Sequence, residues 1–60
     1  MKRRDLEKRM RRHGCSLKRE GGNHSIWHNP EGATVPVPRH SEIADVLARK
    51  ICKDLGIPPP

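Results

Sequence analysis

Apolar residues recur at helical spacing near the start of the chain. Leu6 and Met10 stand four positions apart within residues 3–13, and Lys, Arg and Glu fill most of the other positions. This spacing predicts an amphipathic helix with one narrow apolar face. Gly14 follows directly, and a glycine in that place is typical of a helix end.

A second and stronger helical pattern follows residue 40. Ser41 is a natural N-cap, and Gly56 before three prolines marks where the helix must end. The apolar positions between them fall on one broad face: Ile43, Ala44, Val46, Leu47, Ala48, Ile51, Cys52 and Leu55. We expect a helix here and assign Ile43, Val46, Leu47 and Ile51 to the core, together with Leu17.

The middle of the chain has the period of two that is typical of β-strands. Residues 15–20 alternate, so Cys15, Leu17 and Arg19 are expected on one face and their neighbours on the other. Residues 21–23 (Gly-Gly-Asn) tolerate the backbone of a tight turn, which predicts a hairpin.

The return strand of this hairpin is expected at residues 24–28. A turn at residues 29–32 (Asn-Pro-Glu-Gly) then leads to a third strand at residues 34–38. The third strand contains two prolines, which confine it to the edge of a sheet.

The predicted order is therefore α-β-β-β-α in a single domain spanning residues 1–57. We expect an α+β fold in which a three-stranded antiparallel sheet carries both helices on one face. The opposite face of the sheet is left for solvent or a partner. Residues 58–60, all proline, are expected to form a flexible tail.

The composition limits what this domain can hold. The chain has 60 residues, 32% of them apolar, and Trp27 is its one aromatic residue. Such a core is too small for a buried organic cofactor, so none is expected. Trp27 is assigned to packing in preference to stacking on a base. Cys15 and Cys52 are expected as two reduced thiols.

Most of the net charge of +6 lies near the start of the chain. A polyanion such as RNA, or an acidic protein, would be attracted to such a segment; a merely solvated helix face is the alternative. Within residues 2–12 only Asp5 and Glu7 oppose seven cations: Lys2, Arg3, Arg4, Lys8, Arg9, Arg11 and Arg12.

The chain contains no apolar run of membrane-spanning length, and no apolar stretch follows its basic start. We therefore expect a cytoplasmic protein with no membrane partner.

Several segments together resemble the HicA family of bacterial toxins. They are residues 19–27 (REGGNHSIW), 29–30 (NP), 34–40 (TVPVPRH), 47–51 (LARKI) and 54–56 (DLG). The most specific part is Gly-x-His at residues 22–24 with an aromatic residue three positions on. The resemblance implies a fold related to double-stranded-RNA-binding domains, endoribonuclease (mRNA interferase) activity, and neutralisation by a HicB-type antitoxin.

The resemblance also implies that His24 is catalytic. Histidine titrates near neutral pH and can act as base or acid when a ribose 2′-hydroxyl attacks its phosphate without a metal. From the residues alone, a single strand histidine is more often an ordinary surface residue. Asn23 departs from the serine that many members carry before this histidine, but asparagine also accepts left-handed turn geometry.

A second proton-transfer group is left open among Ser25, His28 and His40. His28 shares a strand face with His24 at roughly 13 Å. The pair also has one half of a zinc spacing, but no Cys-x₂-Cys completes it, so no metal is expected.

Nine cations are candidates to bind the RNA backbone: Lys2, Arg3, Arg4, Lys8, Arg11, Arg12, Lys18, Arg19 and Arg39. Two alternative hypotheses remain besides the ribonuclease: a non-catalytic RNA-binding module of the same fold, and a small basic interaction protein. The free protein is expected to be a monomer.

Overall fold

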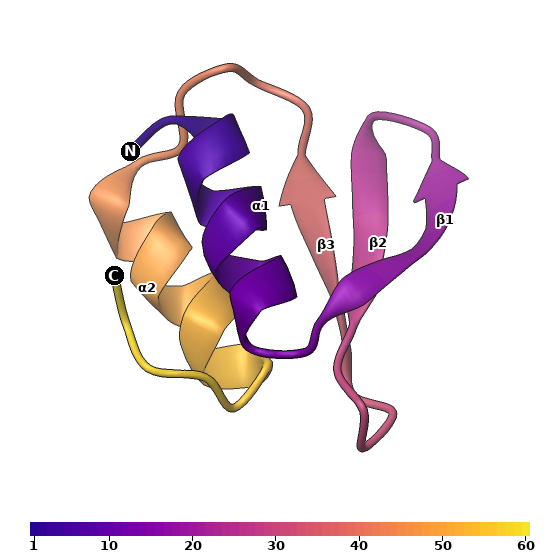
Figure 1. Ribbon diagram of the computed structural model, residues 1–60. Helices are drawn as coiled ribbons and strands as arrows, with labels where there is room; N and C mark the ends of the chain where they lie inside the picture. The colour runs from indigo at the N-terminus through magenta and orange to yellow at the C-terminus, as the bar shows by residue number, and fades with distance from the viewer.

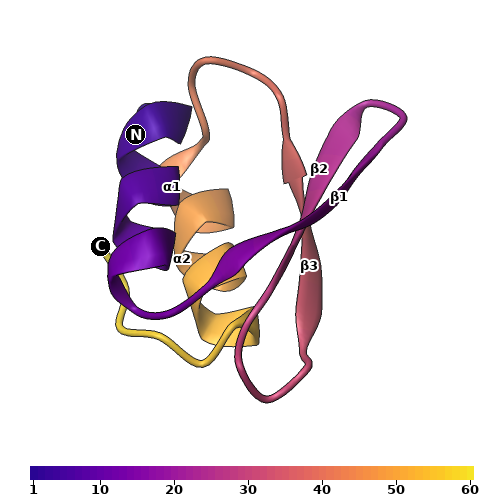
Figure 2. The same ribbon diagram turned by 45° about the vertical axis from the view of Figure 1, so that its right-hand side comes forward.

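Two helices pack on one face of a three-stranded antiparallel sheet in the computed structural model, which describes all 60 residues (Figure 1). Figure 2 views the sheet nearly edge-on, with both helices on one side and the other side uncovered. The predicted fold class is confirmed. The elements are α1 (Arg3–Arg12), β1 (Ser16–Gly21), β2 (His24–His28), β3 (Thr34–Pro38) and α2 (Asp45–Asp54).

The strands lie in the order β1-β2-β3, so the proline-bearing β3 is an edge strand, as predicted. Both β2 and β3 begin and end where the sequence pattern placed them. The end of α1 is also confirmed, because Gly14 adopts φ +87°, a left-handed conformation that favours glycine.

One hydrophobic cluster fills the space between the helices and the sheet. Trp27 belongs to this cluster with 1% of its surface exposed, which confirms its assignment to packing. Cys15 and Cys52 are both buried and form no disulfide, as expected. The cluster is completed by Leu6, Met10, Val35, Val37, Ile43, Ala48, Ile51 and Leu55.

Two residues assigned to the core lie at the surface instead. Val46 is 71% exposed, because the inward face of α2 is formed by residues 48, 51, 52 and 55 and Val46 lies on the opposite side of that helix. Leu17 is 44% exposed, because it lies on β1, the strand farthest from the two helices in Figure 1. Leu47 is only partly buried against the cluster.

The start of α2 differs from the prediction. The helix begins at Asp45 with Ala44 at its N-cap, and Ser41 does not cap it. Residues 41–43 instead run alongside the start of the chain: the Arg3 amide donates to the Ser41 carbonyl at 2.9 Å and the Ile43 amide to the Met1 carbonyl at 2.7 Å. This pairing engages backbone groups that a helix beginning at Ser41 would need for its own hydrogen bonds. It also places Ile43 in the core.

A β-bulge breaks the alternation predicted for β1. The pairing register with β2 shifts between Leu17 and Arg19, so that Leu17 lies opposite Trp27 and Arg19 lies opposite Ile26. Residues directly opposite each other in an antiparallel pair share a face of the sheet. Arg19 therefore lies on the uncovered face and not on the face of Leu17, where the alternation had placed it.

The last residues of the chain lie against α1. Arg9 donates from Nε to the Pro58 carbonyl at 3.1 Å and from Nη2 to the Pro59 carbonyl at 2.6 Å. Neither helix is both long and apolar enough to cross a membrane.

Candidate functional site

The β1–β2 hairpin holds His24 at the edge of its turn. Gly21 and His24 are the last paired residues, and Gly22 and Asn23 form the turn between them. Gly22 has φ +28°, whereas Asn23 is not in a positive-φ conformation. The left-handed tolerance expected of Asn23 is therefore not used: the turn depends on Gly22. His24 is exposed on the uncovered face of the sheet.

A pocket of about 400 Å³ opens beside this turn and is lined by Asn23, His24, Arg39 and His40. The pairing of His24 with Pro38 brings the end of β3 to the start of β2. Arg39 and His40 follow Pro38 directly and so reach the histidine from the other strand. The distance of His40 from His24 could not be judged from the sequence, and the structure places both in one pocket.

Arg39 is bound to the hairpin. Its Nη1 donates to the Gly22 carbonyl at 2.6 Å and its Nη2 donates to Glu20 Oε1 at 2.8 Å. A longer bond of 3.4 Å reaches the carbonyl of His24 itself. This cation, expected to contact RNA, thus fixes the turn that carries His24 while its side chain lines the pocket.

Ser25 does not lie on the face of the sheet that carries His24, where an assisting catalytic group would have to be. It is buried on the helix-covered face, and its Oγ donates to Glu20 Oε1 at 2.8 Å. This hydrogen bond, followed by those from Arg39, lowers the pKa of the Glu20 carboxyl. Glu20 therefore stays ionised and joins Ser25 to Arg39.

Arg19 lies over Gly21 on the uncovered face. A Cβ atom at Gly21 would meet Arg19 Nη1 at 3.0 Å, so the missing side chain leaves room for the guanidinium. Because Gly21 is opposite His24, the bulge places this cation on the face of the sheet that carries the histidine, over the residue paired with it. The strand alternation concealed this placement, since nothing in the sequence marks the bulge.

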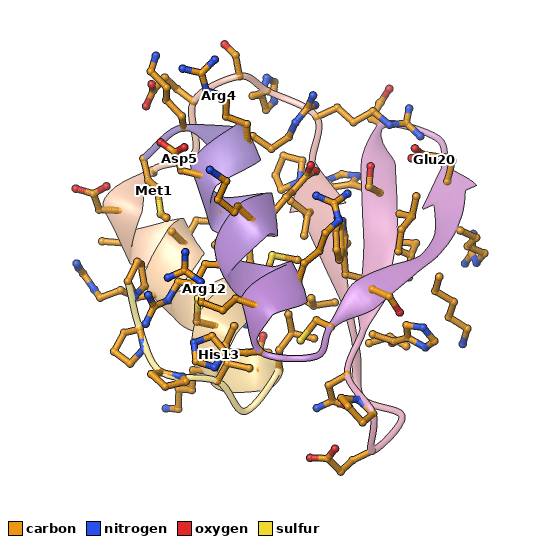
Figure 3. The ribbon with its side chains drawn as sticks, in the orientation of Figure 1. Met1, Arg4, Asp5, Arg12, His13 and Glu20 are labelled. Atoms are coloured by element: carbon orange, nitrogen blue, oxygen red, sulfur yellow. The ribbon has the colours of Figure 1, made fainter.

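The remaining histidines and Lys18 lie outside the pocket. His28 is on the same face as His24 but pairs with Ser16 and Thr34 at the far end of β2. His13 follows the end of α1, and Figure 3 shows it far from Glu20 and the hairpin turn. Lys18 is exposed at the bulge.

The basic residues of α1 divide into two groups. Two of them bind other parts of the chain: Arg3 donates to the Arg39 carbonyl and Arg9 holds the C-terminal residues. The exposed group lies on the face opposite the buried Leu6 and Met10, and Figure 3 shows Arg4 and Arg12 at its two ends. We call this exposed group the basic stripe: Arg4, Lys8, Arg11 and Arg12.

One member of the basic stripe also contacts the core. The Arg11 guanidinium lies 4.9 Å from the centroid of the Trp27 ring, a cation–π distance. Lys2, just before the helix, is exposed and lies 3.7 Å from Glu42. No ion pair binds Arg4, Lys8 or Arg12 within the chain.

No group of three or more His, Cys, Asp or Glu side chains is arranged to hold a metal ion. A family model described as the HicA toxin of bacterial toxin–antitoxin matches residues 3–57. No curated protein and no solved structure matches the chain.

Proposed function

The chain belongs to the HicA toxin family of bacterial toxin–antitoxin systems, and from this membership we propose that it is a metal-independent endoribonuclease. Its substrate is mRNA, and a HicB-type antitoxin neutralises it in the cytoplasm. His24 acts as general base or acid. The free toxin is a monomer.

The pocket at the hairpin turn is the observation that carries this proposal. Cleavage through the 2′-hydroxyl needs a base, an acid and cations near the phosphate. His24 is exposed at the pocket, Arg39 lines it and Arg19 lies on the same face of the sheet. An exposed histidine that serves no packing purpose is what a proton-transfer role requires.

The basic stripe supports RNA as the substrate. Lysine and arginine side chains bind phosphates without reading sequence, and they release counterions when they do so. Trp27, the chain's one Trp, Tyr or Phe side chain, is buried and cannot stack on a base. We therefore assign the main share of the affinity to contacts with the RNA backbone. An antitoxin with an acidic surface would be attracted by the same charge.

Cleavage of a mixed-sequence RNA in EDTA tests the proposal. Parent protein, His24→Ala and His28→Ala are purified in parallel and compared. We expect the parent and His28→Ala to cut at similar rates, and His24→Ala to be slower by about 10²- to 10⁴-fold, the usual contribution of a general acid or base. Equal cleavage by all three would show a contaminant or a wrong assignment.

The basic stripe also supports a second candidate, a non-catalytic RNA-binding module of the same fold. Tight binding of RNA without cleavage by the parent would favour that module. Absence of both binding and cleavage at physiological salt would favour a small basic interaction protein.

A further inference from the structure

We propose that His40 is the second proton-transfer residue and forms an acid–base pair with His24. The inference rests on the proposed ribonuclease function and adds to it the group that completes the reaction. One histidine takes the proton of the 2′-hydroxyl, and the other gives a proton to the departing 5′-oxygen.

The pairing of β2 with β3 brings these two histidines together. His24 lies opposite Pro38, and His40 is two residues beyond Pro38. Both then line the same pocket of about 400 Å³, a volume within the range of roughly 300–1,000 Å³ seen for small-ligand sites. His24 and His40, 16 positions apart in sequence, can thus contact the same bound phosphate group.

The other titratable side chains near the hairpin are unsuited to this role. Glu20 is the carboxylate closest to the turn along the chain, but the hydrogen bonds from Ser25 and Arg39 lower its pKa, which makes it both a poor proton donor and a weaker base. Glu20 also pairs with Ser25 on the helix-covered face, away from the face of His24. The other charged groups around the turn, Arg19 and Arg39, remain protonated and can only stabilise negative charge.

The other two histidines are too far away. His28 is four residues along the same strand, roughly 13 Å from His24 at about 3.3 Å per residue. His13 lies at the end of α1 remote from the hairpin (Figure 3). Neither lines the pocket, which leaves His40 as the histidine that shares it with His24.

The step balances without a metal or a redox partner. The 2′-oxygen forms a bond to phosphorus as its proton passes to the basic imidazole, and the bond from phosphorus to the 5′-oxygen breaks as the acidic imidazolium protonates that oxygen. The products are a 2′,3′-cyclic phosphate and a 5′-hydroxyl. The histidines have then exchanged protonation states, which solvent restores.

A sulfur leaving group separates an acid from a base. The probe is a pool of randomised oligoribonucleotides in which one linkage keeps its 2′-hydroxyl and all other riboses are 2′-O-methylated. In one version the 5′-bridging atom of that linkage is oxygen; in the other it is sulfur, which departs without protonation. The assay compares parent, His24→Ala, His40→Ala and the control His28→Ala on both versions.

On the oxygen substrate, we expect His24→Ala and His40→Ala each to lose about 10²-fold or more in rate, while His28→Ala stays close to the parent. On the sulfur substrate, one of the two slow variants recovers to nearly the parent rate and the other stays slow. The variant that recovers identifies the acid.

Three results overturn the pair: His40→Ala as active as His28→Ala, sulfur rescue of both slow variants, or rescue of neither. These results leave the ribonuclease proposal intact, because the parent still cuts. Failure of the parent to cut either substrate would overturn the proposed function and this inference with it. Far-UV circular dichroism and Trp27 fluorescence verify folding, and His40→Gln replaces His40→Ala if that variant is unfolded.

Discussion

At the scale of single residues, Arg39 links the site to the fold. It donates to the turn at Gly22 and to Glu20, while its carbonyl accepts a hydrogen bond from Arg3 of α1. The first helix, the hairpin and the pocket are thereby joined through one residue, by its side chain and its backbone carbonyl. A lysine would keep the charge but not the planar fork that reaches two acceptors at once.

The positions of Val46 and Ile51 on α2 lead to a prediction about stability. Val46→Thr should change the free energy of unfolding by less than about 0.5 kcal/mol, because its side chain is exposed. Ile51→Ala should cost about 2–5 kcal/mol, because Ile51 is 1% exposed and its removal leaves a cavity. Urea unfolding followed by Trp27 fluorescence measures both. A large loss in Val46→Thr would place that residue in the core after all.

At the scale of elements, α1 carries its buried apolar side chains on one side and its exposed basic side chains on the other. Leu6 and Met10 are buried on one side, and the basic stripe lies on the other. Arg9, Arg11 and Arg12 lie in the last turn, where the helix dipole favours cations, and Asp5 lies in the first, where it favours anions. Two members of the basic stripe, Arg11 and Arg12, therefore also suit the end of the helix that carries them.

Reversing two charges of the basic stripe tests its contact with RNA. We choose Lys8→Glu with Arg12→Glu, because Arg11 also packs over Trp27. The variant should bind RNA more weakly, and the slope of log K against log salt should become shallower by about 0.7–0.9 for each lost phosphate contact. Filter binding across a salt series measures both.

The matched control for this variant is Arg49→Glu with Lys53→Glu on α2. Both residues are exposed and lie outside the basic stripe, and the change in net charge is the same. If both double variants bind RNA equally weakly with equal slopes, net charge alone explains the binding and the stripe is not a contact surface.

At the scale of the whole molecule, one small core holds both layers together, and two thiols are part of it. Burial raises the pKa of Cys15 and also that of Cys52. Each thiol therefore keeps its proton in the folded protein at a pH where the unfolded chain has begun to lose it. Above the ordinary thiol pKa of about 8.5, the folded state binds more protons, so stability falls as pH rises.

We therefore expect the free energy of unfolding to decline between pH 8.5 and the raised thiol pKa values, and to be independent of these two groups near pH 7. Urea unfolding at a series of pH values measures the decline, and the chain has no tyrosine to add its own titration. The control, Cys15→Ala with Cys52→Ala, should be less stable at pH 7 but should decline less. An equal decline in both proteins would assign the effect to other groups.

The sequence alone determined the order of the elements and the family. Glycine and proline set the C-terminal end of α1, the two turns and the edge position of β3, because their backbone preferences are local properties. The Gly-x-His motif with Trp27 identified the HicA family, which the match over residues 3–57 confirms. His24 was singled out by that motif, and its catalytic role stays a prediction.

Only the tertiary structure decided which of these parts meet. The bulge that turns Arg19 toward the face of His24, the extended pairing that keeps Ser41 out of α2, and the exposure of Val46 all depend on contacts between distant segments. The same holds for the pocket, because the register of β2 against β3 places His40 beside His24. The spacing of apolar residues indicates which residues of a segment share a face. Strand register and helix orientation are instead fixed by the particular neighbours that each segment packs against.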